Sequence, residues 1–215
     1  MKNKISINCH SSIKITSEKI IYFDPYLVEQ PSHDADLIFI THDHYDHFDL
    51  PSIKNIIKDT TKIVIPNSIA RHVLASGLNH KNIIGVDPNE QYNIENIEVK
   101  TIPSYNTNKD FHPKKNSWVG YLLNLNDEVI YIAGDTDITV ENQNLYCDIA
   151  LIPIGGTYTM NKEEAAQLIN SIKPKTVIPT HYGSIVGDYK DGRDFKELLN
   201  ENIECILLIG RTKHE

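Results

Sequence analysis

One short run of histidines and aspartates has the residue types and the spacing of a metal site. His42, His44, Asp46 and His47 follow the pattern H-x-H-x-D-H, directly behind the apolar run 37-LIFI-40. Alternate side chains of an extended segment share a face, so His42 and His44 point the same way and can bind one cation. As the chain turns, Asp46 and His47 can face a second position. Imidazole and carboxylate suit zinc, and they also accept manganese or iron.

Two later fragments are built in the same way, with an apolar run that ends at a polar residue. In 129-VIYIAGDTD-137 the polar residue is Asp135, and in 176-TVIPTHYG-183 it is His181. Taken singly, they also fit a turn-forming aspartate and a loop imidazole. Together with the first cluster they complete a site, in which Asp135 bridges two cations and His181 completes the second position. The sequence therefore predicts two divalent metal ions.

The elements that must position these residues are mostly short strands. Apolar runs bounded by Asp, Asn, Gly or Pro are typical of strands. They are found at 19–23, 37–40, 62–65, 83–86, 97–102, 118–125, 129–133, 149–154, 176–180 and 205–209. Helical spacing is found in fewer places, at 49–59, 161–173 and 192–201. Asp49 and Asn161 are the expected N-caps of the first two helices.

Strands and helices recur in both halves of the chain, which favours two sheets packed face to face with helices outside. The 215 residues contain no linker-like or repetitive segment, so we expect a single domain over 1–215. The histidine cluster then lies on a loop between a strand and a helix, where folds of this type keep their sites.

Composition excludes several classes of partner. The formal net charge is −8 and no basic block is present, so we expect no nucleic-acid partner. No apolar run is long enough to cross a membrane, and the first residues lack the apolar segment of a signal peptide. Cys9, Cys147 and Cys205 form no CxxC pair, which predicts free thiols and a cytoplasmic location. The sequence leaves open whether the chain forms a homo-oligomer.

These motifs resemble the metallo-β-lactamase superfamily. The H-x-H-x-D-H loop, a later Gly-Asp and a still later strand-end histidine match its metal framework over nearly the whole chain. The segments 9-CHSSIKI-15, 23-FDPYL-27 and 153-PIGGTYTM-160 resemble one branch, which contains ascorbate-6-phosphate lactonase-like proteins. A more distant member of that branch is the phospholipase D that cleaves N-acyl phosphatidylethanolamines. The resemblance implies a four-layer αββα sandwich with a dinuclear centre between the sheet edges.

The resemblance also implies a role for each matching residue. His42 and His44 match the ligands of the first metal, and Asp46 and His47 match those of the second. Asp135 matches the bridging carboxylate, and His181 matches a ligand of the second metal. Asp24 matches an early aspartate of the family that orients the metal loop by hydrogen bonds.

One position departs from the family pattern. A further histidine for the first metal is expected within 101-TIPSYNTNKDFHP-113, but Asn106 falls at its place. Asn106 could coordinate through its carbonyl oxygen, His112 could fold back, or the first metal could keep two imidazoles and bind loosely. His10 matches a histidine that lies near the centre in this branch. Tyr105, Tyr158 and Tyr182 adjoin site segments and could bind substrate or serve in packing.

The function implied is that of a metal-dependent hydrolase, with zinc as the expected metal, acting on a small cytoplasmic metabolite. Two divalent ions lower the pKa of a shared water, and the resulting metal-bound hydroxide attacks an ester, lactone or phosphodiester. Asp46 is the candidate that orients this nucleophile and takes up its proton.

Two alternatives remain at this stage. One is a compact phosphodiesterase acting on small or cyclic nucleotides. Nucleases of the superfamily carry an extra domain between the later motifs, and the 46 positions between Asp135 and His181 leave no room for one. The other is a metal- or ligand-sensing protein with little turnover, which the departure at Asn106 keeps open.

Overall fold

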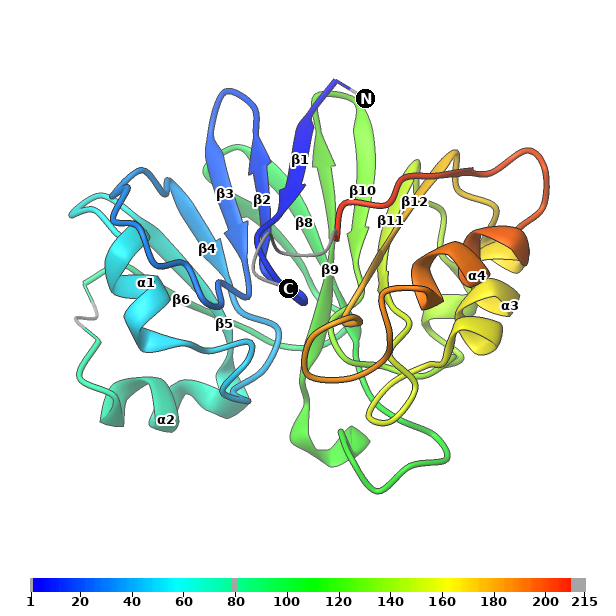
Figure 1. Ribbon diagram of the computed structural model, residues 1–215. Helices are drawn as coiled ribbons and strands as arrows, with labels where there is room; N and C mark the ends of the chain where they lie inside the picture. Colours follow the sequence, from blue (N-terminus) through cyan, green and yellow to red (C-terminus); the bar gives the residue numbers. More distant parts are fainter. Residues whose placement is uncertain (1, 79–80, 210–215) are drawn as a thin grey trace.

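The computed structural model describes residues 2–78 and 81–209. Of the range 1–215 predicted as a single domain, residues 1, 79–80 and 210–215 lie outside this part. Figure 1 shows two sheets packed face to face, with α1 and α2 outside one sheet and α3 and α4 outside the other. The αββα layers expected from the sequence are therefore confirmed.

The first sheet has six strands in the part of the chain that the structure describes. Its order is β1 (Lys4–Ile7), β2 (Ile13–Thr16), β3 (Ile20–Phe23), β4 (Leu37–Phe39), β5 (Lys62–Pro66) and β6 (Ile83–Val86). The pairs from β1 to β3 are antiparallel, and those from β3 to β6 are parallel. The parallel strands end at one edge of the sheet, and the loop that carries His42 to His47 leaves from this edge.

The second sheet has seven strands within the described residues. Its order is β13 (Glu204–Cys205), β12 (Thr176–Thr180), β11 (Ile149–Pro153), β10 (Glu128–Ile132), β9 (Val119–Leu125), β8 (Ile97–Pro103) and β7 (Gln91–Ile94). The pairs from β10 to β13 are parallel, whereas those from β7 to β10 are antiparallel.

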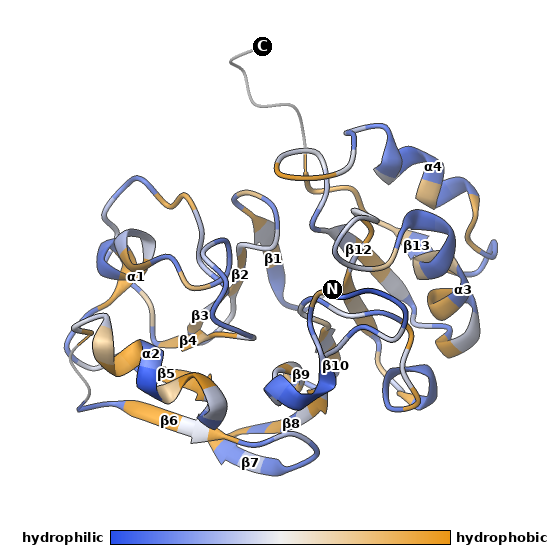
Figure 2. Ribbon diagram, turned by 90° about the horizontal axis from the view of Figure 1, so that it is seen from below, coloured by the Kyte–Doolittle hydropathy of each residue, from blue (hydrophilic) through white to orange (hydrophobic). Residues whose placement is uncertain are grey.

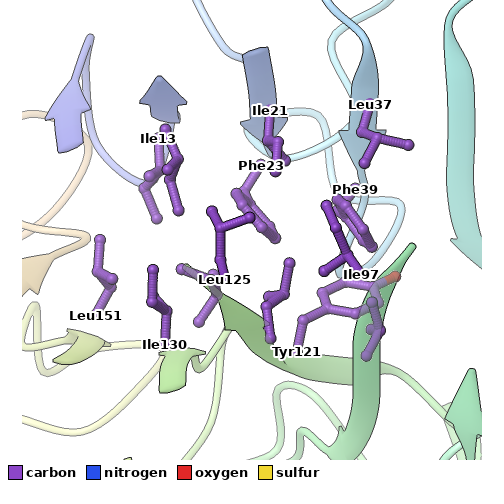
Figure 3. Close-up of a cluster of buried hydrophobic side chains, with 14 of the residues drawn as sticks. Ile13, Ile21, Phe23, Leu37, Phe39, Ile97, Tyr121, Leu125, Ile130 and Leu151 are labelled. Atoms are coloured by element: carbon purple, nitrogen blue, oxygen red, sulfur yellow. The ribbon is translucent and has the colours of Figure 1, made fainter. Parts of the chain in front are cut away.

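The main core lies between the two sheets. Figure 3 shows Phe23 and Phe39 of the first sheet pointing toward Tyr121 and Ile130 of the second. The rings of Phe23 and Phe39 stack with their centroids 5.0 Å apart. The buried hydroxyl of Tyr121 donates to the carbonyl oxygen of Ile40 at 2.7 Å, which joins the two sheets just before the metal loop.

Helices bury the outer faces of both sheets. Alternate residues of β4 point to opposite faces of the sheet. Phe39 packs in the core between the sheets, and Ile38 packs in the cluster with Ile53 and Val73 of the helices. This double burial explains why the parallel strands read as continuous apolar runs. α1 (Leu50–Ile56) and α2 (Ala70–Ala75) lie on the first sheet. In Figure 2 the polar residues of the helices lie mostly on their outward sides.

α3 (Lys162–Ile172) and α4 (Asp191–Glu197) cover the second sheet. Asn161 caps α3 as predicted, because its side chain accepts from the backbone N–H of Glu164 and the Glu164 carboxylate accepts in return. Single-turn 3-10 helices lie at Asn67–Ile69, Lys114–Asn116 and Asn142–Asn144.

Three details differ from the sequence-based expectation. The strand predicted at 205–209 is wrong beyond Cys205, because β13 pairs with β12 only at Glu204 and Cys205. Asp49 occupies the N-cap position of α1 without capping the backbone, since its carboxylate accepts from the Ser52 hydroxyl. β1, β2, β7 and α2 were not predicted. They are short, and the strands among them alternate polar and apolar residues over only four positions, so no apolar run marks them.

Candidate metal centre

Five segments far apart in the sequence bring the candidate ligands together. His42 to His47 follow β4, Asp135 follows β10, and His181 follows β12. His112 lies on the loop after β8, and His10 lies in the turn between β1 and β2. The backbone N–H of His181 donates to the carbonyl oxygen of His10 at 3.1 Å, which links the first sheet to the second at the site. Figure 1 shows the loops that follow β4 and β12 at the same end of the sandwich.

The first group of candidate ligands contains His42, His44 and His112. His44 Nδ1 lies 3.1 Å from His42 Nε2 and 3.2 Å from His112 Nε2. The ring of Trp118 packs beside all three imidazoles, with centroid distances of 4.8 Å to His42, 4.9 Å to His44 and 5.5 Å to His112. The three nitrogens therefore converge on one point against an apolar wall.

Hydrogen bonds on the far side of two of these rings decide which nitrogen is free. His112 Nδ1 lies 3.1 Å from the carbonyl oxygen of Tyr158, which can only accept, so Nδ1 carries the proton. The Thr41 hydroxyl donates to Asp24 at 2.7 Å and so accepts from His42 Nδ1 at 3.0 Å. Both Nε2 atoms then present bare lone pairs to His44 Nδ1, which has at most one proton to donate. A divalent cation would satisfy all three nitrogens.

The second group contains His10, Asp46, His47 and His181, all of them buried. The Oδ2 atom of Asp46 is at its centre. This oxygen lies 3.2 Å from His10 Nε2, 3.5 Å from His47 Nε2 and 3.8 Å from His181 Nε2. Three imidazoles and one carboxylate make a complete donor set for a tetrahedral zinc site.

Asp135 lies between the two groups. Its Oδ2 atom is 3.2 Å from His112 Nε2 and 3.0 Å from His181 Nε2, and its Oδ1 atom is 3.3 Å from His47 Nε2. His42, His47 and Asp135 also form a third overlapping cluster of possible ligand atoms. This position between the groups is the one that a bridging carboxylate requires.

Buried atoms without hydrogen-bond partners gather at this centre. Six buried side-chain nitrogen and oxygen atoms of residues 2–78 and 81–209 lack a partner, and they include His10 Nε2, His47 Nε2 and Asp135 Oδ1. Most buried polar atoms in proteins are hydrogen-bonded, so such a concentration needs an explanation. Ligand atoms of a metal ion fit it, because they face one another at 3.2 to 3.5 Å without forming hydrogen bonds.

Asp24 accepts hydrogen bonds from the segment Thr41 to His47, which is the orienting role that the family resemblance implied. Its Oδ2 atom accepts from His47 Nδ1 at 2.8 Å, and its Oδ1 atom accepts from the backbone N–H of Thr41 at 2.7 Å. A proton fixed on His47 Nδ1 leaves Nε2 free to bind a cation. Through Thr41, the same carboxylate also fixes the ring of His42.

The electrostatics of the centre favour ligand protonation states. Burial, together with nearby imidazoles, lowers the pKa of His42 well below its usual value and also lowers the pKa of His44, so both rings are neutral near pH 7. Burial alone would raise the pKa of Asp135, but His181 and His47 outweigh it and hold this pKa well below the usual range.

At Asp46 and His47, too, neighbouring groups outweigh burial, and both side chains take their charged forms. Burial opposes ionisation of Asp46, but the neighbouring imidazoles of His10 and His47 outweigh it and lower its pKa. Burial also disfavours a charged His47, yet Asp135 and Asp24 raise its pKa well above the usual value. Without a metal, His47 therefore carries a proton that a bound cation would displace.

Four residues at the centre have a left-handed backbone that non-glycine residues rarely adopt. The φ angles are 55° at His10, 44° at Asp24, 55° at His112 and 59° at His181. Each such residue costs about 1–2 kcal/mol. Gly155 leaves room for the His181 backbone, because a Cβ atom at this position would lie 2.2 Å from the carbonyl oxygen of His181.

Among the additional residues expected near the centre, His10 and His112 belong to the two ligand groups. Asn106 instead supports the His112 loop, because its amide nitrogen donates to the carbonyl oxygen of Tyr158 at 2.7 Å. Tyr105 is directed away, since its hydroxyl donates to Glu141 at 2.8 Å. Tyr182 is buried in the core under α3 and α4.

A cavity of about 260 Å³ opens above the two ligand groups. His44, Asp46, His112, Asp135 and His181 form its floor. Its walls are Tyr45, Phe111, Tyr158 and Ile185. Tyr45 follows His44 directly, and its side chain lies at the rim of the cavity although that of His44 lies in the floor.

Sequence reasoning missed Thr41, Trp118, Phe111 and Ile185. Thr41 directly precedes the H-x-H motif, and Phe111 directly precedes His112. These adjacencies were the only signals in the sequence. Trp118 and Ile185 carry none, because an apolar residue at a strand end or in a loop has many ordinary uses.

The comparisons with known proteins agree with this geometry. Residues 4–181 match the β-lactamase superfamily domain. A UPF0173 metal-dependent hydrolase of Thermococcus onnurineus is 32% identical over 220 residues, covering 95% of this chain and 96% of that protein. A second one, of Methanosphaera stadtmanae, is 34% identical over 220 residues and covers 94% and 91%.

Solved structures show the same fold. A Parabacteroides distasonis protein described as a metal-dependent hydrolase is 27% identical with a TM-score of 0.79, covering 95% of this chain and 92% of that one. A metallo hydrolase of Ignicoccus hospitalis is 22% identical with a TM-score of 0.73 and covers 97% and 96%. This second likeness concerns the fold alone. None of the helices within residues 2–78 and 81–209 is long and apolar enough to cross a membrane.

The matched region runs from β1 to His181, so it contains the H-x-H-x-D-H loop, Asp135 between the two ligand groups, and the strand-end histidine of the second group. With near-complete coverage of relatives more than 30% identical, these matches show that the chain belongs to the metallo-β-lactamase superfamily, within the UPF0173 family of metal-dependent hydrolases.

Proposed function

We propose that this protein is a cytoplasmic hydrolase that holds two divalent ions, zinc foremost, and cleaves an ester, lactone or phosphodiester bond of a small molecule. His42, His44 and His112 would hold one ion, and a second set would hold the other. That second set is His10, Asp46, His47 and His181, with Asp135 shared between the two ions. Cys9, Cys147 and Cys205, all within the described ranges, are free thiols, which accords with a reducing compartment.

The observation that carries the proposal is the convergence of three imidazole nitrogens. His44 Nδ1 lies 3.1 Å from His42 Nε2 and 3.2 Å from His112 Nε2. Thr41 and Tyr158 hold the protons of His42 and His112 on the opposite ring nitrogens. Three converging imidazole nitrogens with so few protons repel one another unless a cation lies among them. The donors are nitrogen and carboxylate oxygen, the set that zinc prefers.

The bound ions would supply Lewis acidity and would lower the pKa of a water molecule toward neutrality. Asp46 lines the cavity floor, and its lowered pKa keeps it ionised. An ionised carboxylate in this place can accept a hydrogen bond from the attacking water, orient it, and take up its proton. Asp24, which lies behind the floor, positions His47 and Thr41 without reaching the substrate.

The test combines metal analysis with turnover. Protein purified without chelators should contain up to two divalent ions per chain by elemental analysis. A panel of 4-nitrophenyl butyrate, dihydrocoumarin and bis(4-nitrophenyl) phosphate should include at least one substrate that is hydrolysed. Dipicolinate treatment should abolish this turnover, and added zinc or manganese should restore it.

His44→Ala should lower kcat more than about 100-fold, as expected when a ligand that places the reacting groups is lost. His33→Ala is the matched control, because His33 is exposed, its ring bonds to the carbonyl oxygen of Ile57, and it is not among the residues that line the cavity. Turnover that survives complete metal removal would contradict the proposal. Protein that is fully loaded with metal yet inert toward every substrate class would instead favour a sensing function.

A further inference from the structure

The walls of the cavity differ sharply in chemistry from its floor. Every floor residue is a histidine or an aspartate, whereas the walls are Tyr45, Phe111, Tyr158 and Ile185. Three of these four side chains are aromatic and the fourth is aliphatic. A substrate that reaches the floor therefore passes an apolar surface before it meets any charged group.

Apart from the metal ions proposed at its floor, the cavity offers no cationic side chain from the described residues to an anionic substituent. In the part of the chain that the structure describes, no lysine or arginine lines it. Two lysines on the loop that carries His112 are already paired. Lys109 bonds to the buried Asp137 and lies 3.5 Å from Glu164, while Lys114 lies 2.9 Å from Glu141. Sites that recognise phosphate or carboxylate groups depend on arginine, lysine or helix N-termini, so this cavity lacks the means to select such a group.

The aromatic walls are held in place. The Phe111 ring packs edge-on against Tyr158 with a centroid distance of 4.7 Å and an interplanar angle of 84°. Phe111 directly precedes His112, and the backbone of that loop is closed by Asn106 N–H donating to the carbonyl oxygen of His112 at 2.9 Å. On the other side of the cavity, the Tyr45 ring packs edge-on against the ring of Tyr26, with a centroid distance of 6.1 Å.

The same walls face water in this structure. Phe111 is 47% exposed and Tyr45 is 66% exposed, although both are large aromatic side chains. Covering apolar area gains about 25 cal/mol per Å², so an apolar ligand group would be stabilised here. The cavity volume of about 260 Å³ lies just below the usual range of roughly 300–1,000 Å³ for small-molecule sites, which points to a compact ligand.

We infer that, given the hydrolase proposed above, the substrate is a small ester or lactone with an uncharged, apolar or aromatic group beside the bond that is cut. Water supplies a hydroxyl to the acyl carbon and a proton to the leaving oxygen, so the products are an acid and an alcohol and no further reactant is needed. Metabolites that carry a phosphate or carboxylate beside that bond are selected against.

The test uses two esters that share one leaving group. 4-Nitrophenyl butyrate is neutral, whereas mono-4-nitrophenyl succinate has a similar length and ends in a carboxylate. For the metal-loaded wild-type protein, kcat/KM should favour the butyrate by at least about 10-fold. Phe111→Ala should raise KM for the butyrate several-fold with little change in kcat, and Phe111→Lys should reduce or reverse the preference. Tyr146→Ala is the control, because Tyr146 is 69% exposed and lies outside the cavity walls.

A binding measurement separates this inference from the proposed function. The amide analogues N-phenylbutyramide and N-phenylsuccinamic acid resist hydrolysis, and calorimetry can measure their binding to metal-depleted protein. The neutral amide should bind at least about 10-fold tighter, and Phe111→Ala should remove that advantage. If the hydrolase proposal fails, no metal supports turnover of either ester, yet the binding preference persists. If the inference fails, the succinate ester is cleaved as fast as the butyrate, or the two amides bind equally.

Discussion

The Oδ2 atom of Asp24 lies 2.8 Å from the Nδ1 atom of His47, although 23 positions separate the two residues in the sequence. Both side chains are almost completely buried. The same carboxylate holds the backbone N–H and the hydroxyl of Thr41, at 2.7 Å in each case. One buried aspartate therefore orients two imidazoles of the H-x-H-x-D-H loop, one directly and one through a threonine.

Replacing this aspartate should weaken metal binding without removing a ligand. We expect Asp24→Asn to lower the zinc affinity of the centre by about 10- to 100-fold, as is usual for residues that orient metal ligands. Competition with a chromogenic chelator measures the affinity. Asp127→Asn is the control, because the Asp127 side chain is 93% exposed. Unchanged affinity in Asp24→Asn would refute the orienting role.

The place of His112 predicts a specific loss of stoichiometry. His112→Ala should reduce the metal content from two ions per chain to one, because His42 and His44 alone make a weak site. Asn106→Ala should keep two ions but bind one of them less tightly, since the Asn106 amide nitrogen lies 2.7 Å from the Tyr158 carbonyl oxygen and 3.3 Å from His112 Nδ1 and so supports this ligand from outside. Elemental analysis after gel filtration, with His33→Ala as the reference, distinguishes the two variants. Two tightly held ions in His112→Ala would show that His112 is not a ligand.

Trp118 should report the first metal directly. It is the single tryptophan of the sequence, and its ring packs within 4.8 to 5.5 Å of three candidate ligands. Titration of metal-stripped protein with Co²⁺ or Zn²⁺ should change its emission in proportion to occupancy of the His42–His44–His112 group. The change should vanish in His112→Ala and persist in His10→Ala. An equal response in both variants would contradict the assignment of His112 and His10 to separate groups.

The stability of the metal-free protein should depend on pH through His10. Burial lowers the pKa of His10 to about 4 from an ordinary value of 6.5. The unfolded chain then binds a proton at a higher pH than the folded protein, so the free energy of unfolding falls as the pH drops from about 6.5 to about 4. His10→Asn should remove up to about 3 kcal/mol of this loss. Urea unfolding at several pH values measures it, and parallel pH profiles of wild type and variant would contradict it.

Much of this fold is predictable from local patterns in the sequence. β4, β5, β11 and β12 are continuous apolar runs because both of their faces are buried, and such runs are easily recognised. β1 and β2 are different, because β1 is the edge strand, β2 lies next to it, and each has one face toward water. β7 has a single buried residue, Ile94, so it carries almost no signal.

The predicted ligands His42, His44, Asp46 and His47 lie together partly because they lie together in the sequence. Asp135 and His181 join them because their strands end at the same edge, as strand-end reasoning anticipates. His112 was left as one of several alternatives, because its approach depends on a loop closed by tertiary contacts with Asn106 and Tyr158. The side on which Tyr45 lies depends on the turn after His44, and alternation along a strand does not apply there.

The left-handed backbone at His10, Asp24, His112 and His181 bears on how this protein would respond to selection for heat resistance. Glycine adopts that conformation freely, so laboratory evolution scored only on thermal survival would be drawn toward these four positions. Each such gain would delete an imidazole or the carboxylate that steadies one. Thermal stability and metal binding therefore place opposite requirements on the same four residues, and a useful screen would have to select for both.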